Sequence, residues 1–423
     1  MTVMALLCLP GLGRVKAPIW DETYYIASTA RFHEGRTQFA SHPPLGIMLI
    51  AAGDMASGLN KGADWQAIGA NRAVPAEAMP TTFDYRGPRL APALFGVIAA
   101  GLFCLLMTQL TGSARAGAVL SLLFVADTAL LVQVRSAQLD SFQIAFVLAA
   151  LLAALAAWRG GKPVHFALFG LFIACAALVR ANGLVTGALG LVLLWPAFQR
   201  REWALLLRQA GAGAGGGLAA LALTFTAFYA FSPLPPDPAT PVGQDNARFL
   251  SPAHAAALRD GGRNLGAALQ GLGDYRRYMA NDLAITPAAD ANGSHPAEWL
   301  LARGTILYRA DRRPGHDVLI GLVPNLAAWL VSLLGVLTSL LPSRLRGDSV
   351  RAMLLAAWIA NMAVLQYLDG MRVLYLYHYF IPLLLGHAMA AREWQRHGLP
   401  LLPAGVVAVL VAGAGAAALG YAT

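Results

Sequence analysis

Residues 88–110 read PRLAPALFGVIAAGLFCLLMTQL, a nearly uninterrupted apolar run with a single charged side chain. About 20 apolar residues are enough for an α-helix to cross a hydrocarbon layer roughly 30 Å thick. Comparable runs, separated by short polar or basic stretches, follow near residues 115–133, 139–158, 164–180, 182–198, 207–231, 317–341, 350–368, 372–391 and 400–421. With a shorter apolar segment from Met1 to Leu12, they predict an all-α polytopic membrane protein of about eleven transmembrane helices.

The composition supports membrane residence and argues against a nucleic-acid-binding protein. Hydrophobic residues make up 57% of the chain and charged residues only 13%, unlike a soluble domain of this size. The net charge of +9 comes largely from arginines in short loops between apolar runs, not from one basic face. Cys8, Cys104 and Cys175 lie inside apolar segments without metal-ligand spacing, so we expect packing roles for them.

Lysine and arginine counts in alternate connections predict the orientation of the chain. One set of connections is basic, and short basic loops stay in the cytoplasm; its members lie near residues 115, 159–162, 200–208, 344–351 and 392–396. The opposite set contains two long segments, which we therefore place outside the cytoplasm as a folded cap. We expect an N-terminal membrane region 1–231 that includes the first outer segment 17–87, a second outer segment 232–316, and C-terminal transmembrane helices in 317–423.

The glycine-rich run from Gly211 to Gly217 lies at the start of a predicted span. No Lys-Ser/Thr follows it, so close helix packing explains it better than a phosphate-binding loop. The sequence also shows no 20–50-residue repeat and no pair of inverted halves, which would have favoured a secondary transporter.

Two adjacent carboxylates, Asp21 and Glu22, follow the first apolar segment in the stretch WDETYY at residues 20–25. They fit a solvated turn or the first turn of a helix, where the helix dipole favours acids. They also fit a general base for a hydroxyl nucleophile, a role of Asp or Glu in partly desolvated sites. The stretch SHPPLG at 41–46 follows, in which His42 and Pro43 either shape a turn or bind substrate.

The order of these motifs resembles the first outer loop of the protein O-mannosyltransferase family, GT-C type glycosyltransferases that use polyprenyl-phosphate sugars. Later stretches are similar to family elements in the same order: DTALLVQVRSAQLD at 127–140, SHPAEW at 294–299 and YHYF at 377–380. The resemblance runs from about residue 18 to 391 and implies a compact bacterial form without the large extra domain of eukaryotic members. One departure is Ile47, which stands where the family often has Lys.

The resemblance implies roles for the residues at these positions. Asp21 would be catalytic, with Glu22 orienting it or the acceptor. The donor phosphate would be bound by Arg135, Arg180, His378 and Tyr379, with Arg135 ahead of Arg180 in stabilising the leaving phosphate. Substrate binding or loop positioning would involve His42, Pro43, Asp140, His295 and Trp299. His378 fits a packed core position equally well, and Trp299 fits an anchor at the membrane interface.

An independent argument concerns Arg135, Arg180 and Arg372, which lie on the outer side of the predicted topology. This placement opposes the positive-inside bias that the rest of the chain follows. The arginines either pair with Asp140, Asp369 or backbone carbonyls or extend to the membrane interface, or they bind a lipid phosphate through charge-assisted hydrogen bonds.

The resemblance implies an inverting enzyme that moves mannose, or a related sugar, from a polyprenyl-phosphate to a Ser or Thr hydroxyl of a protein. It would be a multi-pass protein of the inner (cytoplasmic) membrane with its active site on the extracytoplasmic face. Its partners would be the lipid bilayer, the lipid-linked sugar and a protein or glycan acceptor, with no nucleic acid. An aminoarabinose-type transferase acting on lipid or cell-wall glycan stays open, as does a transporter or flippase.

The sequence predicts no cofactor. Neither zinc-ligand nor EF-hand spacing is present. A divalent metal shared by Asp21, Glu22 and His42 would require the first outer segment to fold back on itself.

Overall fold

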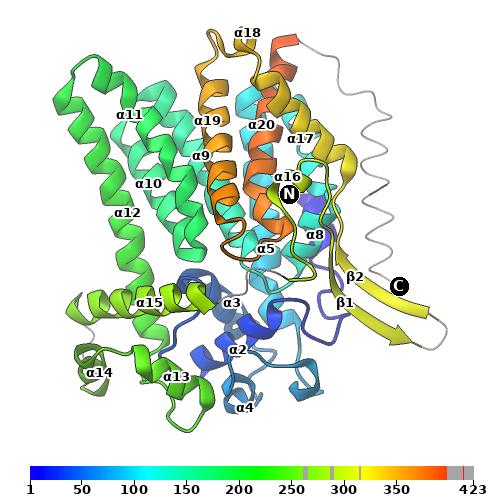
Figure 1. Ribbon diagram of the computed structural model, residues 1–423, viewed down its shortest axis with the longest axis vertical. Helices are drawn as coiled ribbons and strands as arrows, with labels where there is room; N and C mark the ends of the chain where they lie inside the picture. The colour runs from blue at the N-terminus through cyan, green and yellow to red at the C-terminus, as the bar shows by residue number, and fades with distance from the viewer. Residues whose placement is uncertain (261–264, 286–289, 314–315, 398–412, 414–423) are drawn as a thin grey trace.

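The computed structural model describes residues 1–423 except 261–264, 286–289, 314–315, 398–412 and 414–423. This part of the chain is mostly helical, with long helices side by side and shorter helices gathered at one end (Figure 1). A two-stranded hairpin projects from the side of the bundle. The expected helical architecture is confirmed in its main feature.

The long apolar helices form the body of the molecule. Among the described residues, five are long and apolar enough to cross a membrane: α5 (Arg86–Thr111), α9 (Asp140–Gly160), η2 (Ala181–Ala188) joined to α11 (Leu189–Gln199), α12 (Trp203–Phe231) and α19 (Ser349–Leu368). The helices α6 (Ala114–Leu120), α7 (Leu122–Val125) and α8 (Thr128–Arg135) make a sixth only if they are counted as one span, because the chain bends by 70° before α8. Shorter apolar helices are α3 (Pro44–Ser57), α10 (Pro163–Val179) and α17 (Leu326–Ser339). A polytopic membrane protein is supported, whereas the count of eleven spans is not confirmed.

Four predicted spans differ from the helices in the structure. The first is only α1 (Thr2–Cys8), and 115–133 divides at Asp127, whose carboxylate accepts from the Leu130 amide to cap α8. The prediction 317–341 begins in a strand, and 372–391 begins with η3 (Leu376–Tyr379) before α20 (Phe380–His397). Polar caps and irregular stretches interrupt helices that apolar composition alone predicts to continue. The predicted span 400–421 lies outside the described residues apart from residue 413.

The expectation of an all-α fold is wrong at residues 306–322, which form the hairpin. Strand β1 (Ile306–Arg313) pairs antiparallel with β2 (His316–Leu322), and Ile306 lies opposite Leu322. Ile306 and Tyr308 are buried whereas Leu307 is exposed, the alternation expected of a strand with one face on the core. Only residues 317–322 of the hairpin fall in a predicted span. There Leu319 is exposed whereas Ile320 and Leu322 are buried, so a strand period replaces the expected helix.

Most of the two long segments between the apolar runs packs together into one cap at the lower end of Figure 1, whereas their last part, residues 296–313, lies beside the bundle. Residues 17–87 contain α2 (Glu22–His33), α3, α4 (Trp65–Gly69) and η1 (Ala76–Ala78); residues 232–316 contain α13 (Pro241–Phe249), α14 (Pro252–Arg259), α15 (Leu265–Ile285), α16 (Pro296–Trp299) and part of the hairpin. The amide of Thr37 donates to the Leu234 carbonyl (2.7 Å), and the Leu234 amide donates to the Gly35 carbonyl (2.8 Å). Backbone pairing therefore joins segments far apart in sequence.

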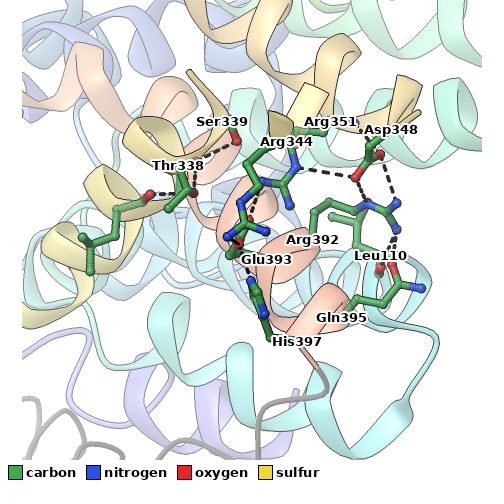
Figure 2. A network of polar contacts seen from close by, with 12 residues as sticks. Leu110, Thr338, Ser339, Arg344, Asp348, Arg351, Arg392, Glu393, Gln395 and His397 are labelled. Atoms are coloured by element: carbon green, nitrogen blue, oxygen red, sulfur yellow. Dashed lines mark hydrogen bonds and ion pairs between the residues drawn. The ribbon is translucent and has the colours of Figure 1, made fainter. Parts of the chain in front are cut away.

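An ion-pair network joins helices at the opposite end of the bundle (Figure 2). It connects α20 to α19 and to α18 (Pro342–Leu345): Arg351 Nη1 lies 2.5 Å from Glu393 Oε2, and Arg392 Nη2 lies 3.0 Å from Asp348 Oδ1. Arg392 also donates to the carbonyl of Leu110 at the end of α5 (3.1 Å). These arginines belong to the basic set that the sequence predicts on the cytoplasmic side.

The glycine-rich run provides close packing between α10 and α12, as expected. A Cβ atom on Gly170 would lie 1.9 Å from the Gly213 carbonyl oxygen, and one on Gly216 would lie 1.9 Å from the Ala167 oxygen. Any side chain at these contacts would force the two helices apart.

Candidate active site

A cavity of about 500 Å³ lies where the cap meets the ends of the long helices. Residues from four parts of the chain line it: the start of α2, the loop before α3, helix α15 and the segment 372–378. Arg180, directly after α10, also lines it. Of the residues singled out from sequence, this cavity brings together Asp21, His42, Arg180, Arg372 and His378.

Asp21 is the N-cap residue of α2, but its side chain makes no capping hydrogen bond. Its carbonyl instead accepts from the amides of Tyr24 and Tyr25, which begin the helix. Burial raises the pKa of the Asp21 carboxyl to about 6, and the positive charge of Arg180 opposes this rise. The carboxyl therefore titrates close to neutral pH, as a general base must.

Glu22 points away from the cavity and is fully buried against Arg89 of α5. Arg89 Nε lies 2.8 Å from Glu22 Oε1, and Arg89 Nη2 lies 2.7 Å from Oε2. The amides of Ile19 and Ala137 also donate to this carboxylate, at 2.8 and 2.6 Å. Because these donors occupy the carboxylate, the structure does not bring Glu22 to the acceptor or to Asp21 as the sequence suggested.

We expect Arg89→Met to destabilise the fold strongly. Removing one partner of a buried ion pair leaves an uncompensated charge and typically costs about 3–5 kcal/mol. Arg89 also donates to the carbonyls of Leu12, Val15 and Ala17, which the variant would leave without these bonds. Thermal unfolding of the purified protein in detergent measures the loss.

Arg86→Met on the same helix is the matched control. Arg86 forms an exposed pair with Asp84, and exposed pairs contribute little to stability. If the midpoint temperature of unfolding fell equally in Arg89→Met and Arg86→Met, the structural role assigned to Arg89 would be contradicted.

Arg180 is buried yet incompletely paired. Its Nη2 lies 3.2 Å from Asp140 Oδ2, and its Cζ lies 5.1 Å above the ring of Tyr377. Within the described part of the chain its Nε has no hydrogen-bond partner. Asp140 lies behind Arg180 and does not line the cavity. A buried guanidinium with an unused donor is suited to an anion in the cavity.

Arg372 and two histidines complete the polar lining. Arg372 follows α19, and in the described residues its Nε has no hydrogen-bond partner. His378 Nδ1 lies 3.0 Å from the donating amide of Tyr375. Burial, with Arg180 and Arg372 nearby, holds the pKa of His42 well below its usual value, so this ring is neutral. Pro43 caps α3 and does not line the cavity.

Four other predicted site residues lie elsewhere. Arg135 donates to the carbonyls of Leu7 and Pro10 and lines a separate space of about 50 Å³. Trp299 and Tyr379 are buried in the core, with ring centroids 6.3 Å apart. His295 is exposed and lies 3.0 Å from Asp369. The structure therefore does not place these four residues at the cavity.

Sequence reasoning missed several lining residues, among them Tyr25, Arg31, Arg72, Tyr278 and Asp282. Arg72 forms an ion pair with Asp282 of α15, joining the two halves of the cap. The only sequence signal that could have indicated any of these lining residues was the four-residue spacing of Tyr278 and Asp282, which places both on one helix face. A pair separated by about 200 residues has no local signature.

The described residues contain no cluster of three His, Cys, Asp or Glu side chains arranged to hold a metal ion. Asp21 and His42 line one cavity, but Glu22 is committed to Arg89. The three residues do not form the shared metal site considered from the sequence.

The family model for dolichyl-phosphate-mannose-protein mannosyltransferases matches residues 2–231, more than half of the chain. The chain belongs to this family. The matched part of this mannosyltransferase family member includes Asp21, His42 and Arg180. Arg372 and His378 come from the C-terminal part, so the cavity joins residues from inside and outside the matched region.

Curated relatives agree with the family membership. Protein O-mannosyl-transferase 1 of Mus musculus is 30% identical over 202 residues, covering 43% of this chain and 26% of the mouse protein. The protein of the same name from Rattus norvegicus is 30% identical over 199 residues, covering 44% of this chain and 25% of the rat protein. The chain spans about a quarter of the length of these relatives.

Solved structures share the fold. The S. cerevisiae protein O-mannosyltransferase Pmt1-Pmt2 complex bound to the sugar donor matches with a TM-score of 0.73 at 11% identity, covering 99% of this chain and 88% of that chain. ArnT from Cupriavidus metallidurans in the apo state matches with a TM-score of 0.51 at 15% identity, covering 94% of this chain and 58% of the ArnT chain. The GT-C type fold expected for this mannosyltransferase family member is confirmed.

Proposed function

We propose that this protein is an inverting glycosyltransferase that moves mannose, or a related sugar, from a polyprenyl-phosphate to a Ser or Thr hydroxyl of a protein. One observation carries the proposal: a single cavity holds Asp21, a carboxyl that titrates near neutral pH, together with Arg180 and Arg372. A base and two cations are what transfer from a phosphate-linked sugar requires.

Asp21 acts as the general base in the proposed reaction. Its carboxylate takes the proton of the acceptor hydroxyl, and the oxygen attacks the anomeric carbon of the sugar. The bond between that carbon and the phosphate oxygen breaks as the new bond forms, so the configuration inverts. Arg180 and Arg372 stabilise the negative charge on the departing lipid phosphate, with their donors already in place before the reaction.

The reaction takes place on the extracytoplasmic side of the inner membrane in this proposal. The cavity lies beneath the cap, and the arginine-rich network of Figure 2 lies at the opposite end of the bundle. Basic clusters mark the cytoplasmic ends of membrane helices. The lipid donor then reaches the cavity from the outer leaflet of the bilayer.

A reconstitution assay tests the function. Purified protein in liposomes is expected to transfer radiolabelled mannose from polyprenyl-phosphate-mannose to a Ser/Thr-containing peptide, with inversion at the anomeric carbon. Parallel reactions supply polyprenyl-phosphate-aminoarabinose, or replace the peptide by a glycolipid or cell-wall glycan. Transfer only in a parallel reaction would change the proposed sugar or acceptor, and solute uptake without any transfer would replace the enzyme by a transporter.

A further inference from the structure

Trp20, directly before Asp21, has a backbone φ of 52°. This left-handed conformation is unfavourable for a bulky aromatic residue and persists where surrounding contacts hold it. The chain here directs Asp21 to the cavity and the next residue, Glu22, to Arg89. Whatever holds Trp20 therefore also determines where the Asp21 carboxyl lies.

Two tyrosines hold the indole of Trp20. The ring of Tyr308 on β1 stacks on it, with centroids 5.2 Å apart and planes inclined by 18°. Tyr375 meets it edge-on at 5.5 Å. Tyr375 lines the cavity, whereas Tyr308 is buried behind it. Tyr308 therefore does not line the cavity, and its packing and hydrogen-bond contacts reach the site through other residues.

The hydroxyl of Tyr308 connects to the other side of the site. It donates to Gln133 Oε1 (2.6 Å), and Gln133 Nε2 donates to Asp140 Oδ2 (2.5 Å). The same Asp140 oxygen lies 3.2 Å from Arg180 Nη2. Aromatic stacking and a hydrogen-bonded chain therefore join one side chain to both Asp21 and Arg180.

We propose that Tyr308 is a positioning residue. Its ring holds the base Asp21 in place through Trp20, and its hydroxyl holds the phosphate-binding Arg180 in place through Gln133 and Asp140. The inference rests on the proposed function, because it assigns Asp21 and Arg180 the roles given above. The hairpin is then more than a surface projection, since β1 supplies the residue that fixes the relative positions of these two groups.

Two variants separate the contributions of the ring and the hydroxyl. Tyr308→Phe keeps the stack on Trp20 and removes the bond to Gln133, so the KM for polyprenyl-phosphate-mannose is expected to rise about tenfold and kcat to fall less than in Tyr308→Leu. Tyr308→Leu removes both contacts, so kcat is also expected to fall about 10²-fold because the base is misplaced. Tyr229→Phe removes a buried tyrosine hydroxyl bonded to His254 (3.0 Å) and is the control.

A second readout needs no turnover. The infrared band of the protonated Asp21 carboxyl, isolated by difference against Asp21→Asn, is followed over pH. The charged and titratable groups that act on Asp21 are Arg180, Asp140, Arg372, Tyr25, Tyr375, Tyr377 and Tyr308. In Tyr308→Leu the carboxyl is expected to become more hydrated and its pKa to fall from about 6, while Tyr308→Phe leaves it near the wild-type value.

The outcomes distinguish the two proposals. Absence of transfer by the wild-type protein would refute the proposed function, while the Asp21 titration would still report whether Tyr308 positions that residue. Wild-type kinetics together with an unchanged Asp21 titration in Tyr308→Leu would overturn the positioning role. If Tyr308→Leu does not fold, an unchanged donor KM in Tyr308→Phe overturns the hydroxyl connection to Arg180, and a tenfold rise supports it.

Discussion

Asp21→Asn is expected to bind polyprenyl-phosphate-mannose with wild-type affinity and to lose transfer by about 10²–10⁴-fold, the usual contribution of a general base. The amide keeps the size and polarity of the side chain but cannot accept the acceptor's proton. Donor binding is measured by equilibrium partitioning with radiolabelled donor, and transfer by product formation under saturating donor. The effect should therefore appear in kcat rather than in donor affinity.

The raised pKa of Asp21 also predicts in which direction the transfer rate changes with pH. Because burial raises the pKa of Asp21 to about 6, the base is half protonated at that pH in the free enzyme. The rate constant kcat/KM should fall below pH 6, by about tenfold at pH 5, instead of holding until pH 4 as with an exposed aspartate.

Asp64→Asn is the matched control for Asp21→Asn. Asp64 is an exposed N-cap of α4 in the same outer segment and accepts from the amide of Ala67 (3.0 Å). It should keep wild-type transfer. Wild-type turnover in Asp21→Asn would remove Asp21 from the base role, and the acid limb of the pH profile would then belong to another group.

Arg180→Gln is expected to lower transfer by about 10²–10³-fold, comparable to the loss of a single preorganised donor to a developing negative charge. It also leaves the buried carboxylate of Asp140 without its cation, which should destabilise the fold by about 3–5 kcal/mol. Transfer kinetics and thermal unfolding are therefore measured on the same preparations.

A double variant separates these two effects. Asp140→Asn combined with Arg180→Gln replaces the ion pair by two neutral amides, so stability should recover while transfer stays low. Arg135→Gln provides the comparison outside the cavity. If Arg135→Gln lost more donor affinity than Arg180→Gln, donor-phosphate binding would belong to Arg135.

The sequence predicted most of the body of the fold. Runs such as 88–110 became long apolar helices because an apolar segment of about 20 residues has few other stable arrangements in a bilayer. The predicted spans failed where a polar cap or a strand pattern intervened. Asp127 divides one apolar run, and the first residues of another form a strand in which Leu319 is exposed and Ile320 and Leu322 are buried.

The site was only partly accessible from the sequence. The adjacent carboxylates and outer-side arginines predicted a polar site, and Asp21, His42, Arg180, Arg372 and His378 do share one cavity. The sequence favoured Arg135 over Arg180 for the departing phosphate, whereas the structure places Arg180 and not Arg135 in the cavity. The Arg135 side chain instead donates hydrogen bonds to the carbonyls of Leu7 and Pro10.

By itself, the sequence determined a helical membrane protein and predicted a carboxylate pair and displaced arginines on its outer side, because hydrophobic length and charge asymmetry are local properties. Only the tertiary structure decided that Asp21 faces the cavity while Glu22 binds Arg89. We attribute this division to the left-handed backbone at Trp20 and to its stacking with Tyr308, 288 positions later in the chain. Contacts between residues so far apart exist only in the folded protein, so spacing along the sequence cannot reveal them.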